Sequence, residues 1–85
     1  MKSAEFIISD PAGIHARPAG YLVKEAEKYR SEIRISCRDK SASAGRLFAL
    51  MKLGAKQGDT LTVSAEGEDE DAALAAVLSF MKEHF

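Results

Sequence analysis

The sequence predicts an α+β fold: a four-stranded antiparallel sheet with three helices on one face, in the order β-α-β-β-α-β-α. Two observations predict it. The strand-like segments alternate apolar and polar residues, which is typical of a sheet with one solvated face. The helix-like segments each carry one apolar stripe. With 85 residues, the chain is expected to form a single domain over residues 1–85.

The first half of the chain predicts a strand, a helix and a second strand. SAEFIIS alternates at residues 4, 6 and 8, and the turn residues DPAG end it. From Ala16, apolar residues at 19, 22, 23 and 26 have helical spacing, and Lys28 and Arg30 are expected near the C-terminal end, which favours cations. SEIRISCRD is the clearest strand, and Cys37 at its end is expected to be a small core residue.

The second half predicts two strands and two helices. RDK at 38–40 fits a tight turn into a short strand, KSASA. Apolar residues at 47, 50, 51 and 53 predict a short helix that Gly54 ends, and TLTVSAEG predicts the last strand. The acidic run at 68–71 precedes a helical pattern from Leu74 to Met81. We expect it to start this helix, because carboxylates favour the positive end of the helix dipole.

Composition argues against several classes of function. The net charge is −1 and the 12 basic residues are scattered, so no nucleic-acid partner is expected. No segment approaches the roughly 20 apolar residues that span a bilayer, and the N-terminus does not resemble a signal peptide. We therefore expect a cytosolic protein without direct membrane insertion. The single cysteine allows no intrachain disulfide and no cysteine-based metal site.

The segment DPAGIHARPAG carries the candidate chemistry. It places His15 at or beside the N-cap of the first helix and Pro18 in the first turn, where a missing N–H costs no hydrogen bond. The free N–H groups of Ala16 and Arg17 would form an anion site, and the Arg17 side chain can add charge-assisted hydrogen bonds to phosphate. A neutral imidazole can attack a phosphoryl group and carry it covalently. Gly13 and Gly20 would allow close backbone approach to that group or to a partner.

Other interpretations of the histidines remain open. A histidine beside a helix start is usually only a polar surface or capping residue. A metal site is not favoured, because His84 belongs to the far C-terminal turn and no cysteine cluster supports it. His84 is expected to be a solvated residue stabilised by the helix dipole. A self-sufficient enzyme is not favoured either, because His15 has no recognisable base, metal set or substrate pocket.

GIHARPAG closely resembles the active-site segment of the HPr family, the histidine-containing phosphocarriers of the bacterial phosphoenolpyruvate-dependent sugar phosphotransferase system. The length, the order of elements and LMKLGAKQGDTLTVSAEGEDEDAALAAV also match this family. The resemblance implies an open-faced sandwich and a stoichiometric carrier that is not an enzyme and has no cofactor. His15 would take a phosphoryl group from Enzyme I and pass it to sugar-specific IIA components, and Arg17 would stabilise the phosphate.

The resemblance also implies a partner-binding patch. The family docks its partners beside the active site through apolar residues, which correspond here to Leu47, Phe48 and Met51, with Gly20 and Lys24 on the first helix. Phe48 lies off the apolar stripe of its helix, which fits an exposed anchor. Leu47 and Met51 are equally consistent with ordinary core positions.

Two positions depart from the family pattern. Arg46 stands where many Gram-positive HPr proteins have a serine that a dedicated kinase phosphorylates, and Ala12 stands where the family often has Ser or Asn. An arginine is also a poor N-cap for a helix. The alternative function is therefore an HPr-like regulatory paralogue that binds a transcription factor or an enzyme. Nothing in the sequence indicates oligomerisation, so a monomer is expected.

Overall fold

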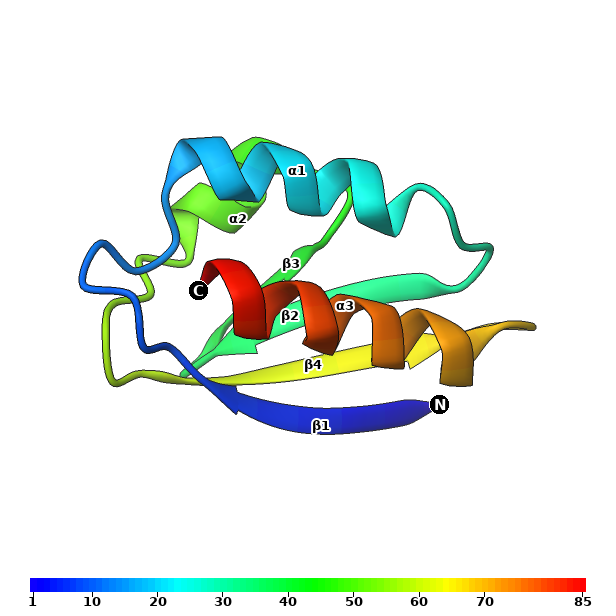
Figure 1. The fold of residues 1–85 in the computed structure, drawn as a ribbon. Coiled ribbons are helices and arrows are strands. Elements are labelled where there is room, and N and C mark those ends of the chain that lie inside the picture. The colour runs from blue at the N-terminus through cyan, green and yellow to red at the C-terminus, as the bar shows by residue number, and fades with distance from the viewer.

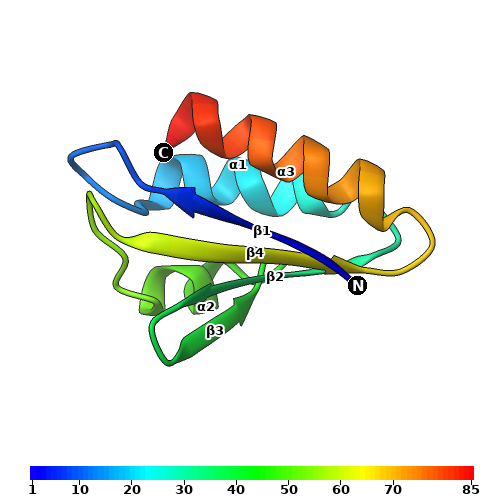
Figure 2. The same ribbon diagram turned by 90° about the horizontal axis from the view of Figure 1, so that it is seen from below.

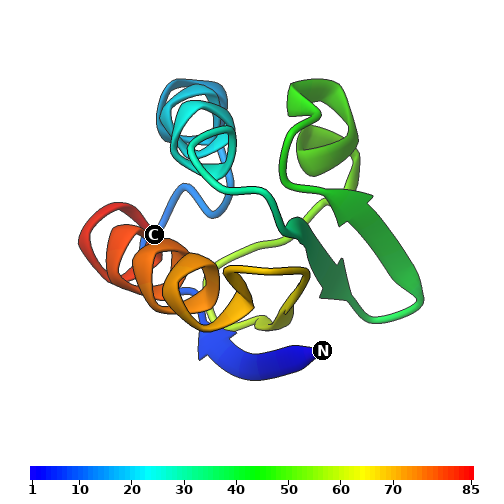
Figure 3. The ribbon, with the colours of Figure 1, turned by 90° about the vertical axis from the view of Figure 1, so that its right-hand side faces the viewer.

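The computed structural model describes all 85 residues, Met1–Phe85, as four strands and three helices. The strands are β1 (Lys2–Ile7), β2 (Glu32–Cys37), β3 (Lys40–Ser43) and β4 (Thr60–Glu66). The helices are α1 (Ala16–Ala26), α2 (Leu47–Lys52) and α3 (Glu70–His84). All three helices lie on one side of the sheet, as Figures 1 and 3 show. The predicted fold class and element order are confirmed.

The sheet is antiparallel throughout, in the order β1-β4-β2-β3, so that β4 pairs with both β1 and β2 (Figure 2). At its centre Val63 pairs with Ala4 on one side and Ile35 on the other. The alternation of the strands places the apolar residues toward the helices and leaves the other face polar. Burial of each large apolar side chain contributes about 1.5–3 kcal/mol, so this alternation fixes which face the helices cover.

Each helix attaches to the sheet through fully buried side chains. Leu22 of α1, Leu50 of α2, and Val77 and Met81 of α3 have no exposed surface. Cys37, at the end of β2, is 1% exposed and confirms the predicted core cysteine. α2 ends as predicted, because Gly54 follows it with a positive φ of 64°.

α1 stops at Ala26, the last residue of its predicted apolar stripe, and Lys24 is the basic residue of its last turn. Lys28 and Arg30 follow two and four residues after this end, near it as expected but outside the helix. After the helix, Lys28 N–H donates to Glu25 O, a three-residue hydrogen bond of 3.2 Å that tightens the chain. The Lys28 ammonium then pairs with the Glu25 carboxylate at 3.1 Å.

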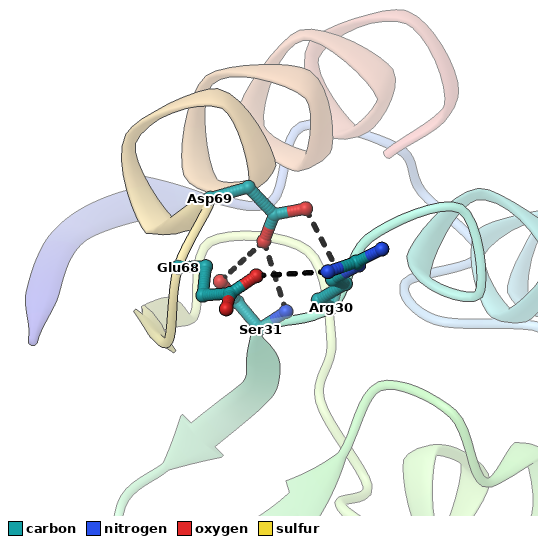
Figure 4. A network of polar contacts seen from close by, with 4 residues as sticks. All are labelled: Arg30, Ser31, Glu68 and Asp69. Carbon is teal, nitrogen blue, oxygen red and sulfur yellow. Dashed lines mark hydrogen bonds and ion pairs between the residues drawn. The ribbon is translucent and has the colours of Figure 1, made fainter.

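The chain after α1 is held by Asp69, which lies just before α3 (Figure 4). Asp69 Oδ2 accepts a hydrogen bond from Arg30 N–H at 2.9 Å. Asp69 Oδ1 accepts from the Ser31 N–H at 2.9 Å and from the Ser31 hydroxyl at 2.6 Å. Glu68 adds an exposed ion pair with the Arg30 guanidinium at 3.1 Å. Because these bonds bind Arg30 and Ser31 in a non-helical connection, they explain why α1 cannot continue.

The acidic run therefore has two roles. Glu70 and Asp71 lie in the first turn of α3, as expected from the helix dipole, and Glu70 also accepts a hydrogen bond from Gly67 N–H at 3.2 Å. Asp69 is the N-cap of α3, at the helix start as expected, but its side chain makes no capping hydrogen bond. The carboxylates of Glu68 and Asp69 bind the connection between α1 and β2, a role that the dipole explanation did not include.

We predict that Asp69→Asn lowers the thermal midpoint by about 5 °C at neutral pH, because one acceptor oxygen is lost. The hydrogen bond from the Ser31 hydroxyl, followed by the one from Arg30 N–H, holds the pKa of Asp69 below its ordinary value of 3.8. Because the pKa of Asp69 is lower in the folded protein than in the unfolded chain, its ionised carboxylate stabilises the fold. This stabilisation is fully present above pH 3.8 and is lost as the pH falls through the pKa of Asp69 in the folded protein.

The difference in thermal midpoint between wild type and Asp69→Asn should therefore become smaller at acidic pH. Thermal melts from pH 7 to pH 2.5 would measure this change. Asp71→Asn is the matched control, since its carboxylate is 81% exposed in the same turn. An equal loss of stability in both variants would contradict the role assigned to Asp69.

Candidate functional site

His15 is the N-cap of α1, as the sequence predicts. Its backbone is extended (φ −127°, ψ 166°), and its carbonyl accepts the N–H of Ala19 at 3.1 Å as the helix begins. The imidazole makes no capping hydrogen bond and is 41% exposed. The imidazole is therefore not used to cap the helix, and its ring nitrogens remain accessible.

The first turn of α1 has free hydrogen-bond donors. The first N–H groups of a helix have no hydrogen-bond acceptor within the helix. Because Pro18 has no N–H group, the free N–H groups in this turn are those of Ala16 and Arg17. Pro18 is buried and fixes the start of the helix, while the Arg17 side chain is exposed and makes no ion pair. Two N–H groups and one free guanidinium therefore lie directly after His15.

His15 opens into a surface cavity of about 450 Å³. Beside His15, the cavity is lined by Asp10, Arg17, Pro18, Tyr21, Glu83 and His84. The cavity thus lies between the start of α1 and the end of α3, and it brings together residues almost 70 positions apart in the sequence.

The end of α3 is joined directly to the loop that precedes His15, and the C-terminus lies beside this loop in Figures 1 and 2. The N–H groups of Ser9 and Asp10 both donate to the carbonyl of Phe85, each at 2.7 Å. The Phe85 ring is 2% exposed and meets the His15 ring edge to face, with 6.5 Å between centroids. The expectation that His84 lies far from His15 was wrong, because these bonds bring the end of the chain to the site. The His84 ring stacks on Phe80 at 4.3 Å.

The loop before His15 is packed against a second loop. Gly13 has a positive φ of 66°, and a Cβ there would collide with Ala55 O and lie 3.0 Å from Lys56 Cα. Ile14 N–H also donates to Ala55 O at 3.3 Å. Gly13 is buried, so its close approach is to this loop, and the expectation of an approach to a phosphoryl group or a partner was wrong for it. Gly20 is half-buried with open space beside it.

Asp10 is a site residue that the sequence analysis missed. Its Oδ2 lies 3.7 Å from His15 Nε2, within ion-pair distance. Its Oδ1 accepts the N–H of Ala12 at 2.8 Å, which makes a local turn of the kind that aspartate favours. The sequence DPAG could have indicated this turn, because an aspartate before Pro-x-Gly typically starts a turn. The side chain of such an aspartate accepts a hydrogen bond from the backbone of the same loop.

The apolar residues of α2 differ in exposure. Phe48 is 79% exposed and Met51 is 37% exposed, whereas Leu47 is half-buried against the core. α2 contacts α1, where Gly20 is partly accessible and Lys24 is exposed. Phe48 therefore lies off the buried stripe as expected, and Met51 is not a core residue.

Basic side chains without ion-pair partners flank these apolar residues. Arg17 and Lys24 lie on α1, and Arg46 and Lys52 lie at the two ends of α2. All four are exposed, and none forms an ion pair within the chain. Arg46 is the N-cap of α2 and makes no side-chain capping bond, as expected of a poor capping residue. The α1–α2 surface is therefore apolar with positive charge around it.

No group of three or more His, Cys, Asp or Glu side chains is placed to hold a metal ion. No helix combines the length and the apolar character that crossing a bilayer requires.

We predict that Gly13→Ala displaces the loop that carries His15. The added Cβ meets backbone atoms that cannot move aside as a side chain would, and the positive φ is strained for alanine. The thermal midpoint should fall by about 5–10 °C, and the backbone amide signals of residues 10–16 and 55–56 should move in an NMR spectrum. Gly20→Ala is the control, since nothing lies within 4 Å of its Cβ. Equal spectra for both variants would contradict this packing.

Comparisons with known proteins agree on one family. A family model described as the PTS HPr component phosphorylation site matches residues 2–83. The phosphocarrier protein HPr of Mycoplasma pneumoniae is 40% identical over 85 residues, covering 99% of this chain and 97% of the relative. That of Lysinibacillus sphaericus is 41% identical over 83 residues, covering 98% and 94%. The crystal structure of HPr-C-His from Thermoanaerobacter tengcongensis superposes with a TM-score of 0.91 at 35% identity, covering 98% and 93%.

Proposed function

Because the chain belongs to the HPr family of phosphocarrier proteins, we propose that it carries a phosphoryl group on His15. The donor would be Enzyme I, and the acceptors would be sugar-specific IIA components of the bacterial phosphotransferase system. The observation that carries the proposal is the imidazole of His15, uncapped and 41% exposed, in one cavity with Arg17. Members of the family are phosphocarriers, not catalysts, so each transfer uses the chain stoichiometrically.

The transfer is a nucleophilic substitution at phosphorus. The lone pair of a ring nitrogen of His15 forms the new N–P bond while the bond from phosphorus to the donor breaks, and the donor keeps that electron pair. In the second transfer the His15 nitrogen is the leaving group, and the nucleophile belongs to the acceptor. Neither step changes an oxidation state.

The phosphoryl oxygens would be held by the start of α1. The N–H groups of Ala16 and Arg17 are free, and the helix adds partial positive charge at this end. The Arg17 guanidinium makes no ion pair within the chain, so it can form charge-assisted hydrogen bonds to the phosphoryl oxygens. Since phosphoryl transfer depends mainly on positioning and charge stabilisation, these groups suffice when a partner covers the open cavity.

Partners would dock on the α1–α2 surface. Phe48 is the anchor, with Leu47 and Met51 beside it and Gly20 and Lys24 contributed by α1. Exposed aromatic residues among apolar neighbours are typical centres of interfaces. The unpaired basic side chains around them favour partners whose docking faces are apolar with an acidic rim.

Arg46 supports a second candidate function, that of a regulatory paralogue which binds a transcription factor or an enzyme. An arginine has no hydroxyl group to phosphorylate, so a serine-directed kinase cannot act at this position. Arg46 is instead a fixed positive charge at the start of α2, one residue before the apolar patch. Such a surface could bind a regulatory target without any transfer step.

In the carrier role, residues 1–85 act as one HPr domain, in the cytosol and as a monomer. The same face must meet the donor and then each acceptor, so a second copy of the chain covering this face would block transfer. The buried residues of all the elements form one continuous apolar core, which supports a single folding unit.

We predict that His15→Ala abolishes phosphorylation and leaves the fold intact. Its imidazole makes no capping bond and is partly exposed, so truncation should change the stability by no more than about 1 kcal/mol. The measurement is mass spectrometry after incubation with Enzyme I, Mg²⁺ and phosphoenolpyruvate. Wild type should gain one acid-labile phosphoryl group, and the variant none.

The outcome separates the two candidate functions. No adduct on wild type, with an Enzyme I that phosphorylates another HPr protein, would refute the carrier role and favour the regulatory one. An adduct that persists in His15→Ala would assign the acceptor to another residue.

We predict that Phe48→Ala weakens the binding of Enzyme I about tenfold, as expected for the anchor of an interface. Ile7→Ala is the matched control, because Ile7 is also a large exposed apolar residue, 63% exposed, but lies on edge strand β1. Calorimetric titration of each variant would show the difference. Equal affinity of Phe48→Ala and wild type would rule out this patch as the docking site.

A further inference from the structure

We propose that the outer edge of strand β3 docks an extended acidic segment of a partner protein, which adds to the sheet as a further strand. The surface consists of this edge and the part of α2 that lies beside it. The inference does not rest on the phosphoryl transfer proposed above, since none of the residues involved lines the cavity of His15.

The outer edge of β3 has unpaired backbone groups. β3 is the last strand in the order β1-β4-β2-β3, so only one of its edges is paired (Figures 2 and 3). Ala44 N–H donates to Ile33 O at 2.8 Å. This pair continues the register in which Ser43 faces Arg34. In an antiparallel ladder, residues that bond to the partner strand alternate with residues that do not. The N–H and C=O groups of Ser41 and Ser43 therefore point away from β2.

Ser41 is the point on this edge where both backbone groups are free. The carbonyl of Ser43 accepts the N–H of Arg46 at 3.1 Å and is used within the chain. No loop or turn hydrogen bond involves the N–H or the C=O of Ser41. Its hydroxyl is occupied separately, because it accepts Arg34 Nη2 at 2.9 Å. An extended segment beside β3 can therefore form both main-chain hydrogen bonds with Ser41.

A surface cavity of about 380 Å³ lies beside this edge, between β3 and the end of α2. It is lined by Lys40, Ser41, Ala49, Lys52 and Leu53. Neither lysine forms an ion pair within the chain, and no acidic residue lines the cavity. Two unpaired ammonium groups are thus placed next to a free backbone edge. We call the β3 edge and this cavity the β3–α2 groove.

The charge of the β3–α2 groove defines the partner. Successive side chains of a strand point to opposite faces. Ala42 is buried under the helices, so Lys40 shares its face and Ser41 points to the open face of the sheet. An added strand would place every second side chain beside Lys40 and Lys52, where a carboxylate meets an unpaired cation. A lysine on an edge strand disfavours pairing with an apolar strand, so the groove selects a segment with acidic residues at alternate positions.

The opposite edge of the sheet, on β1, does not offer the same site. Ile8 N–H donates to Asp59 O at 3.0 Å in continuation of the β1–β4 register. By the same alternation, the outward backbone groups of β1 belong to Ser3, Glu5 and Ile7. The carboxylate of Glu5 would repel an acidic segment, and no cavity is lined by a residue of β1. The combination of a free edge, a cavity and unpaired cations occurs only at β3.

The test is a titration of the ¹⁵N-labelled protein with the capped peptide TETETETE, followed by ¹H–¹⁵N NMR. This peptide has a high strand propensity from threonine and carries its glutamates on one face. The amide signals of Ser41 and Ser43 should move, and hydrogen exchange of the Ser41 N–H should slow roughly tenfold at saturation. The capped peptide TKTKTKTK is the charge control and should not bind. Binding of both peptides, or of neither, would overturn the proposal.

N-methylated peptides test whether the segment adds as a strand. In an extended peptide, the N–H groups of the threonines and of the glutamates point to opposite edges. Antiparallel addition places a threonine opposite Ser41, because both side chains point to the open face. TETETETE methylated on every threonine nitrogen should therefore lose binding, whereas the peptide methylated on every glutamate nitrogen should bind as the parent does. Equal affinity of the two methylated peptides, strong or weak, would overturn strand addition.

Substitutions in the protein test the groove itself. Lys40→Gln and Lys52→Gln should each weaken the binding of TETETETE roughly two- to fivefold, the size expected for an exposed ion pair. Lys82→Gln is the matched control, since Lys82 is an exposed lysine without an ion pair on α3. An equal loss in Lys82→Gln would reveal unspecific attraction and contradict the site.

Two further measurements separate the groove from other surfaces. Phe48→Ala should leave the affinity for TETETETE unchanged, because Phe48 does not line the groove. A loss in this variant would place the peptide on the α1–α2 surface and overturn the proposal. Shifts of the Ser41 and Ser43 amides that appear on raising the protein concentration alone would assign the edge to a second copy of the chain, and would overturn it as well.

Discussion

The site depends on the docking of the loop before His15 onto the end of α3. The N–H groups of Ser9 and Asp10 both donate to one carbonyl, that of Phe85, at 2.7 Å each. Ser9 is exposed and Asp10 is half-buried, so each of these hydrogen bonds contributes roughly 0.5–1.5 kcal/mol of net stability. The same contact sets the two walls of the cavity, the orientation of the Asp10 carboxylate and the edge-to-face contact that restrains the His15 ring. The chemistry of α1 is therefore arranged by the last residues of the chain.

Stability and chemistry are located at opposite ends of the helical layer. The Asp69 network joins the end of α1 to the start of α3, while the cavity joins the start of α1 to the end of α3. An 11-residue helix is about 16 Å long, so substitutions at the two ends should act on the fold nearly additively. The sheet and the buried faces of the helices connect them, and neither end contributes a charged side chain to the core. The exposed imidazole can thus change its covalent state without disturbing the network that holds the helices.

The sequence was sufficient to predict those features that depend on neighbouring residues. Alternation in SEIRISCRD and TLTVSAEG reports burial on one sheet face, and Pro18 next to a helical stripe locates His15 at a helix start. It failed where the determinant lies far along the chain. The hydrogen bonds of Asp69 hold the connection after α1 from 39 residues beyond Arg30, and the proximity of His84 to His15 is set by bonds to Phe85. Asp10 was missed for a related reason: the turn it starts is visible in DPAG, but the position of its free oxygen depends on the hydrogen bond from its N–H to Phe85 O at the far end of the chain.

The electrostatics of the α1–α2 surface bear on how a carrier of this kind could be controlled. A carrier must leave each partner quickly, which argues for a small apolar anchor such as Phe48 with charges that steer the encounter. A phosphoserine at the start of α2 would add nearly two negative charges beside this anchor and would repel an acidic rim. Arg46 places a permanent positive charge there instead. If partners dock on this surface as proposed, their binding responds to ionic strength and to the charge of the partner, and not to a phosphorylation event at position 46.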